Sequence, residues 1–179
     1  MRKTIEIRPL DEAELSLYCE HLMRLDDHAR WMRFNHIMDD AALQAHCLYL
    51  AGSGTMLIGA FEDDKLRGAA ELGLSTDHSV PIVEMAFSVE SNFQGRGIGS
   101  SLLKTALTAI WPASAIVVCR ADNAAMRHLA ERAGGHCDLA DDLLFYRIDT
   151  LYAIQGNAQL GPRKKSGNQR NNLKLAHTA

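Results

Sequence analysis

A loop with three alternate glycines, placed between a strand pattern and a helix pattern, constrains this chain more than any other feature. The apolar residues 82–89 lead into Gln94-Gly95-Arg96-Gly97-Ile98-Gly99, and an apolar stripe at helical spacing then runs to Ile110. Backbone N–H groups at a helix N-terminus are unpaired and carry positive potential, and glycines let a ligand approach the backbone closely. The loop therefore predicts an anion site, for a pyrophosphate, over Gly95–Ser100. A tight turn whose glycines serve packing alone is the alternative.

The spacing of these glycines disfavours two common phosphate-binding patterns. Gly95, Gly97 and Gly99 are separated by single residues, whereas the dinucleotide-binding pattern is G-x-G-x-x-G at the start of a βαβ unit. A P-loop ends in Gly-Lys followed by Ser or Thr, and that ending is missing here. A different nucleotide-phosphate enzyme is therefore disfavoured.

The pattern that does match is Q-x-x-G-x-G, formed by Gln94, Gly97 and Gly99. It resembles the pyrophosphate loop of the GNAT family of acetyl-coenzyme A-dependent N-acetyltransferases. The segment from Asn123 to Gly134 is similar to the second helix of that family, N-x-x-A-x-x-L-Y-E-K-x-G. The resemblance covers about Thr4–Asp149. Within the family, residues 84–99 and 30–34 are most like the bacterial protein-lysine acetyltransferases.

The order of expected elements is strand, helices, three strands, helix, strand, helix and two strands, which indicates an α+β fold around a mixed sheet. We expect strands at residues 4–8, 55–61, 66–74, 82–89, 114–119, 136–139 and 143–149. We expect helices at residues 11–22, 26–36, 39–50, 98–110 and 123–133. The resemblance implies a GNAT-like fold, with a mostly antiparallel sheet of about seven strands, flanked by helices and splayed between its fourth and fifth strands.

The resemblance also implies where acetyl-coenzyme A would lie. In the family, pantetheine bonds to the main chain of the fourth strand and the phosphates contact the glycine loop. Carried over by position, the coenzyme contacts are Phe87, Ser88, Val89, Gln94, Gly95, Arg96, Gly97, Ile98, Gly99, Ser100 and Asn123. Asn123 is also placed to cap the following helix, and both roles can hold together.

Glu84 is the candidate general base. An ammonium must lose a proton before it can attack a thioester, and burial in an apolar strand would raise the pKa of a carboxyl group toward the useful range. Glu84 also matches the position of the glutamate taken as general base in the resembling lysine acetyltransferases. The alternative is a glutamate on an exposed strand face. The family's thiolate-protonating tyrosine is missing, because its position is Ala130.

The charge of the chain is unevenly distributed. Residues 155–179 contain five basic and no acidic residues, so residues 1–154 hold 14 basic and 22 acidic residues. An acidic body argues against nucleic acid as the main partner and suits a cationic acceptor. Pairs such as Asp26-Asp27 can attract an amine, although such pairs are typical of turns and caps. We expect an N-acetyltransferase domain at 1–154 and a basic, flexible tail at 155–179.

The function that the resemblance implies is transfer of an acetyl group from acetyl-coenzyme A to a primary amine by direct attack. The acceptor is left open between a protein lysine and a small-molecule amine. The alternative from another class is a non-catalytic acyl-coenzyme A-binding sensor or interaction module on the same fold. The missing tyrosine supports this alternative, and Glu84 opposes it.

The remaining polar residues suggest neither metal binding nor a membrane location. The four cysteines, Cys19, Cys47, Cys119 and Cys137, show no zinc-type spacing, so we expect buried, reduced thiols and no metal. No apolar run approaches the roughly 18 residues that a membrane helix needs. The charged start lacks the apolar stretch of a signal peptide. We therefore expect a cytoplasmic protein.

Overall fold

A computed structural model describes residues 4–75, 82–140 and 142–151. Within these residues, no helix combines the length and the apolar character that crossing a membrane requires. The expected tail at 155–179 and the end of the expected domain lie outside the described residues.

Seven strands form one sheet in the order β1-β2-β3-β4-β5-β7-β6. Only the β4–β5 pair is parallel, and the other five pairs are antiparallel. The mixed, mostly antiparallel sheet predicted from the sequence is therefore confirmed. The strands are β1 (Glu6–Pro9), β2 (Met56–Glu62), β3 (Lys65–Ser75), β4 (Ile82–Val89), β5 (Ser114–Arg120), β6 (His136–Ala140) and β7 (Leu143–Asp149).

Aspartate and asparagine side chains begin most of the helices. Asp26, Asp39 and Asn123 each accept a hydrogen bond from a backbone N–H in the first turn of the helix that follows. These caps place acidic pairs at helix starts, as the turn-and-cap interpretation predicts. The helices are α1 (Leu15–Met23), α2 (Asp27–Phe34), α3 (Asp40–Leu50), α4 (Ile98–Ala109) and α5 (Ala124–Arg132), with single 3₁₀ turns at Glu12–Glu14 and Ser91–Phe93.

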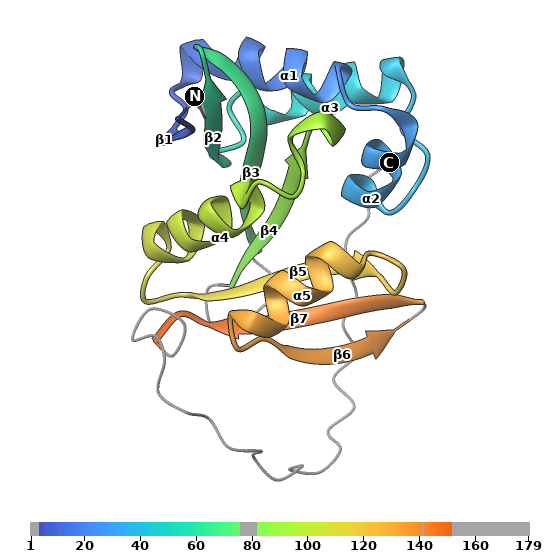
Figure 1. Ribbon diagram of the computed structural model, residues 1–179, viewed down its shortest axis with the longest axis vertical. Coiled ribbons are helices and arrows are strands. Elements are labelled where there is room, and N and C mark those ends of the chain that lie inside the picture. Colours follow the sequence, from blue (N-terminus) through green and yellow to red (C-terminus); the bar gives the residue numbers. More distant parts are fainter. Residues whose placement is uncertain (1–3, 76–81, 141, 152–179) are drawn as a thin grey trace, which may run out of the picture.

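The helices cover the two faces of the sheet unequally. Side chains alternate along β2, so Ile58 and Ala60 pack with α4 and α5, while Leu57 and Phe61 pack with α1, α2 and α3. In Figure 1, β2, β3 and β4 run steeply down the view, whereas β5, β7 and β6 run nearly across it. The sheet therefore bends at the β4–β5 junction, where α2 on one face and the α4 N-terminus on the other come close to it.

The cysteines correct one prediction. Cys19 of α1 and Cys47 of α3 form a disulfide, with their Cα atoms 5.9 Å apart. Cys119 is a buried free thiol as expected, whereas Cys137 is free but exposed. The expectation of buried, reduced thiols is therefore wrong for three of the four cysteines. The pairing joins positions 28 residues apart in the chain, and only the side-by-side packing of α1 and α3 brings them together.

Candidate active site

The site begins where β4 and β5 separate. Their parallel pairing runs from Ile82 with Ser114 to Met85 with Val117 and then stops, although both strands continue. Beyond Met85, β4 therefore has no partner on its β5 side, and its backbone polar groups there are open to a ligand. This is the splay that the resemblance predicted between the fourth and fifth strands.

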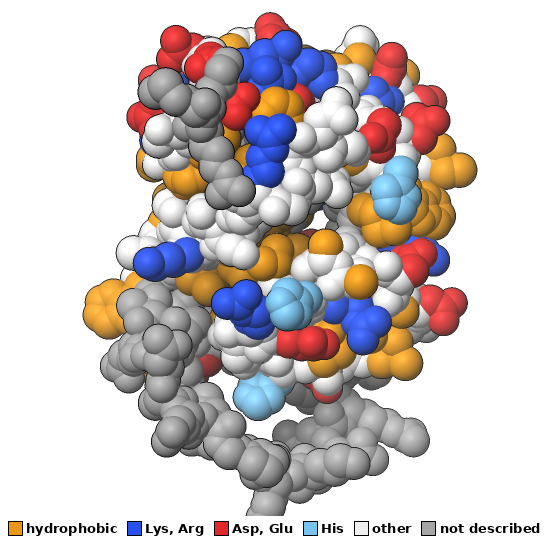
Figure 2. Space-filling view, viewed as in Figure 1, with side chains coloured by type: hydrophobic (Ala, Val, Ile, Leu, Met, Phe, Trp, Pro, Cys, Tyr) orange, Lys and Arg blue, Asp and Glu red, His pale blue; other side chains and the backbone are white. Residues whose placement is uncertain are grey.

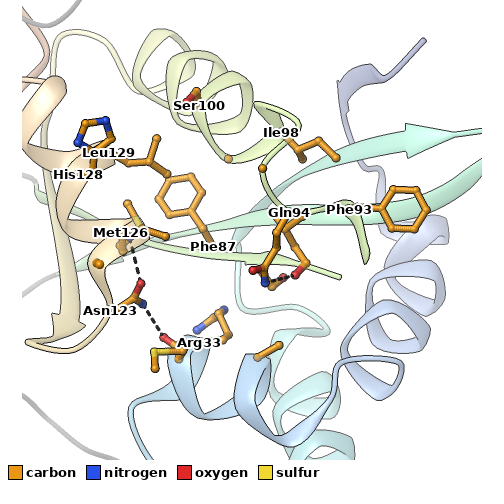
Figure 3. A pocket seen from close by; sticks show the side chains of 18 of the residues that line it. Arg33, Phe87, Phe93, Gln94, Ile98, Ser100, Asn123, Met126, His128 and Leu129 are labelled. Atoms are coloured by element: carbon orange, nitrogen blue, oxygen red, sulfur yellow. Dashed lines mark hydrogen bonds between the residues drawn. The ribbon is translucent and has the colours of Figure 1, made fainter. Parts of the chain in front are cut away.

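A cleft of about 510 Å³ occupies this gap. Figure 2 shows the molecule hollowed between its upper and lower parts, and Figure 3 shows the residues around the hollow. The structure brings ten of the eleven predicted coenzyme contacts together in its lining. These are Phe87, Ser88, Val89, Gln94, Gly95, Gly97, Ile98, Gly99, Ser100 and Asn123. Most of the other lining residues come from α2 and α5.

The backbone conformation of the loop explains two of its glycines. Gly95 and Gly97 have φ angles of 72° and 84°, which other residues rarely adopt. A Cβ atom built on either residue would meet no atom within 4 Å among the described residues beyond its chain neighbours, so the space above the loop is open. Packing therefore does not explain these two glycines. It does explain Gly99, whose Cβ would lie 3.1 Å from Leu129 of α5.

The N-terminus of α4 supplies positive potential without help from a basic side chain. Gly97 is its N-cap and offers no side-chain hydrogen bond, so the first N–H groups are available to a ligand. The helix has 12 residues, long enough for a dipole at its end. Among the described residues, the charged or titratable side chains that line the cleft are His28, Arg33, Asp122 and His128. Backbone groups of the loop are therefore the main feature suited to a pyrophosphate.

Arg96 is the predicted contact that the structure places elsewhere. Its guanidinium lies 3.3 Å from the Glu62 carboxylate, donates to the Asn92 carbonyl at 3.0 Å and covers the Phe93 ring. It does not line the cleft. The neighbouring Gln94 donates its amide N–H to the Val89 carbonyl at 3.1 Å, which closes the turn between β4 and the loop.

Asn123 has two structural contacts, visible as dashed lines in Figure 3. Its Oδ1 accepts from the Met126 backbone, which confirms the predicted cap. Its Nδ2 donates to the Met32 carbonyl of α2 at 3.3 Å, across the cleft. Arg120, at the end of β5, also covers the Trp31 ring of α2 at 4.7 Å. These two contacts tie α2 to the far wall of the cleft.

Glu84 is exposed, so the predicted burial of this carboxylate is wrong. It lies on the face of β4 that the alternative interpretation described, because Val83 and Met85 point into the core on the other face. Burial acts to lower the pKa of the Arg33 guanidinium. Interactions with Tyr18 and Glu71 outweigh burial and raise this pKa, and the charge of Glu84 makes a smaller contribution in the same direction. Glu84 therefore lies on the face of the sheet that α2 covers. Its role as base remains a prediction.

A buried cluster around Glu71 lies on the same face. One carboxylate oxygen of Glu71 accepts from Tyr18 of α1 at 2.8 Å, Arg33 of α2 at 2.7 Å and His46 of α3 at 2.9 Å. Burial acts to raise the pKa of Glu71, but Arg33 and His46 outweigh it and lower the pKa to about 2. Tyr18 and Tyr146 are both buried.

The sequence interpretation missed a second buried group that reaches the cleft. His21 of α1 is fully buried, and its Nε2 lies 2.9 Å from the Ser88 hydroxyl. Its Nδ1 lies 3.5 Å from the Glu90 carboxylate. The available signal was the helical spacing of Tyr18, His21 and Leu22, which places His21 on the buried face of α1.

Comparisons with known proteins agree with this geometry. Residues 19–135 match the acetyltransferase (GNAT) family, and the chain belongs to that family. No match was found in a search of curated proteins.

Solved structures share the fold at low sequence identity. The GNAT domain of S. lividans PAT is 16% identical with a TM-score of 0.66, and the match covers 81% of this chain and 90% of that one. The structure of yncA from Salmonella typhimurium, which contains acetyl-CoA, is 18% identical with a TM-score of 0.62 and coverage of 89% and 98%. The paia N-acetyltransferase of Thermoplasma acidophilum, in complex with coenzyme A, is 15% identical with a TM-score of 0.62 and coverage of 82% and 99%.

Proposed function

We propose that this protein is an N-acetyltransferase that moves an acetyl group from acetyl-coenzyme A to a primary amine. The observation that supports this most is the β4–β5 gap, which opens onto a positive-φ glycine loop at the N-terminus of α4. The coenzyme supplies a thioester, which an amine can attack directly. Backbone groups of Phe87 and the N–H of Val89 lie where β4 has lost its β5 partner and are suited to the pantetheine amides, and the loop is suited to the pyrophosphate.

The acceptor is proposed to approach from the face that carries Glu84. That face is flanked by α2, and the described body of the protein is acidic, which suits a cationic amine. Glu84 takes the proton that the ammonium must lose before it attacks, either directly or through water. The acceptor is a protein lysine or a small amine. The protein-lysine subtype rests on the resemblance of residues 84–99 and 30–34 alone.

The alternative is a non-catalytic binder of acyl-coenzyme A on the same fold. The observation that favours it is Ala130, which is fully buried where the family has its tyrosine. A thiol-release assay with acetyl-coenzyme A over a panel of lysine peptides, polyamines and small amines separates the two functions. The proposal expects amine-dependent release, and binding without release would contradict it.

A charge placed beside the loop tests the coenzyme site itself. Ser100 and Ser101 are adjacent and exposed in the first turn of α4, but only Ser100 lines the cleft. Ser100→Glu adds a negative charge where a phosphate would lie, without the backbone strain that a substitution at Gly97 brings. We expect it to weaken coenzyme A binding at least about tenfold, since like charges at close range cost on the order of 1 kcal/mol or more.

The matched control for this test is Ser101→Glu. It adds the same charge one residue further along the helix, and we expect a clearly smaller loss. Isothermal titration calorimetry with coenzyme A measures both. Equal affinities for Ser100→Glu and the unmodified protein would contradict the phosphate assignment.

A further inference from the structure

Ser88, His21 and Glu90 form a chain of polar groups that leads from the cleft into the core. Ser88 lines the cleft and is 6% exposed. Its hydroxyl lies 2.9 Å from Nε2 of His21, and Nδ1 of His21 lies 3.5 Å from the carboxylate of Glu90. Ser88 lies in β4, His21 lies in α1, and Glu90 directly follows β4. The tertiary fold therefore brings the three residues together.

Glu90 is fixed as an anion by two arginines. Arg24 donates to one carboxylate oxygen at 2.9 Å, and Arg67 donates to the other at 3.0 Å. Burial would raise the pKa of Glu90, but the nearby His21 and the hydrogen bonds from Arg24 and Arg67 lower it to about 2. Glu90 is therefore ionised at neutral pH and faces the one imidazole nitrogen that does not face Ser88.

His21 is placed to be neutral at rest and to accept a proton. Burial lowers its pKa most, Glu90 opposes that effect, and Arg24 and Arg33 add to it. Its Nδ1 makes no hydrogen bond with any residue that the structure describes, although Glu90 lies at ion-pair distance. A proton on Nδ1 points it toward Glu90 and leaves Nε2 free to accept from Ser88.

Ser88 lies beyond the point where the strands separate, whereas Glu84 lies before it. The last β4–β5 pair is Met85 with Val117, and strand residues rise about 3.3 Å each. Glu84 and Ser88 point to the same face of β4, so they flank the bottom of the gap from opposite sides. Ser88 lines the cleft, whereas Glu84 lies on the same face of the strand outside the cleft lining.

Amine acetylation moves two different protons. The ammonium form of the acceptor loses one before attack, and the attacking nitrogen loses a second after its bond to the carbonyl carbon forms. The departing thiolate gains one when the carbon–sulfur bond breaks. Ala130 leaves the family's usual donor for that last step missing.

We propose that the Ser88–His21–Glu90 chain carries the second proton from the nitrogen to the thiolate. This inference rests on the proposed acetyltransferase function and adds a proton path to it. The Ser88 hydroxyl takes the proton from nitrogen while passing its own to Nε2 of His21, and Glu90 stabilises the resulting imidazolium. The same path in reverse returns the proton to sulfur. The products are the amide, the free thiol and the first proton, which Glu84 releases to solvent.

Removing the Ser88 hydroxyl is the direct test. We expect Ser88→Ala to lower kcat about 10²-fold, the lower end of general acid–base effects, with little change in KM for acetyl-coenzyme A. Ser88→Thr keeps a hydroxyl and should recover most of the rate. The matched control is Thr150→Ala, which removes another buried hydroxyl, bonded to the Ala113 carbonyl at 2.8 Å outside the cleft. It should turn over like the unmodified protein.

The pH dependence distinguishes a proton path from packing. The acid limb of kcat should reflect His21, below the ordinary imidazole value of about 6.5, and should vanish in Ser88→Ala. The loss in Ser88→Ala should persist at a pH where the amine is neutral, because that change affects the second proton and not the first. Losses in Ser88→Ala and Glu84→Gln should therefore add in the double variant.

Nuclear magnetic resonance of ¹⁵N-histidine provides a readout that needs no turnover. In the protein without ligand, His21 should be a neutral Nδ1–H imidazole at pH 7, and its Nε2 shift should change in Ser88→Ala but not in Thr150→Ala. His21→Gln assigns the signal.

Four results would overturn the proton path. They are unchanged kcat in Ser88→Ala, equal losses in Ser88→Ala and Thr150→Ala, an Nε2–H tautomer of His21, and a stable acetyl group on Ser88 after exposure to acetyl-coenzyme A alone. The last would make Ser88 a nucleophile. Absence of amine-dependent thiol release from the unmodified protein would instead overturn the acetyltransferase proposal, and the proton path with it.

Discussion

Two glutamates on one face of the sheet show how far the surroundings decide what a carboxylate can do. Glu71 of β3 pairs with Ala86 of β4, and Glu84 of β4 pairs with Gly73 of β3. The two glutamates therefore lie on neighbouring strands. Glu71 is enclosed by three donors and is held as an anion, whereas Glu84 is exposed beside the cleft. The buried carboxylate of Glu71 is therefore held by its partners, and the exposed carboxylate of Glu84 is the one proposed as the base.

Glu84→Gln tests the role of the exposed carboxylate. The change keeps the shape and removes the basicity, so we expect turnover at neutral pH to fall about 10²–10⁴-fold. The loss should shrink as the pH approaches the amine pKa of about 10.4, where the acceptor needs no base. Steady-state kinetics from neutral to alkaline pH measures this, and coenzyme A affinity should stay the same. An unmodified rate at neutral pH would remove Glu84 from the mechanism.

At the scale of elements, Glu71 joins one strand to three helices. Its partners Tyr18, Arg33 and His46 lie on α1, α2 and α3. Because Arg33 is 7% exposed, neutralising Glu71 leaves a buried cation without its counter-ion. The cluster therefore holds the three helices against β3, and α2 also forms one wall of the cleft.

We expect Glu71→Gln to lower the free energy of unfolding by about 3 kcal/mol at neutral pH. The pKa of Glu71 is lowered to about 2, so its contribution is present above the ordinary glutamate range and is lost as the pH falls through that range toward 2. Denaturant unfolding at several pH values measures the difference between variant and parent, which should shrink with acidification.

The control for Glu71→Gln is Asp40→Asn. Asp40 is also paired with an arginine, Arg30, at 2.7 Å, but its side chain is 64% exposed. Exposed ion pairs contribute less than about 1 kcal/mol, so we expect a small change. Similar losses in both variants would show that burial does not set the strength of the Glu71 cluster.

The elements themselves could be predicted because each follows from local chemistry. The cap at Asn123, the period of α4 and the strand 82–89 are visible within a few residues, and the structure has all three. The glycine loop was predictable for the same reason. The Cys19–Cys47 disulfide, the donors on Glu71 and the His21–Ser88 contact were not, because they join residues 25 to 67 positions apart. Glu84 was misjudged because an apolar strand can still expose one of its faces.

At the scale of the whole molecule, the charge division suggests that the basic tail is separable from the catalytic body. Residues 155–179 lack acidic residues and a clear apolar period, so they have little to contribute to a core. We expect a chain ending at residue 154 to keep its melting temperature and its turnover nearly intact. Differential scanning calorimetry and the thiol-release assay measure both, and a large loss of either would show that the tail packs or docks.

The ties between α2 and the far wall of the cleft have a consequence for the sequence of binding events. Asn123 holds the Met32 carbonyl and Arg120 covers Trp31, so α2 bridges the gap into which the pantetheine arm must fit. Placing the arm under this bridge fixes the position of the helix that also faces the acceptor. An acceptor bound first would lie on the α2 side of this passage and obstruct the entry of the arm. We therefore expect a compulsory order, in which the acyl donor enters before the amine and the thiol leaves last.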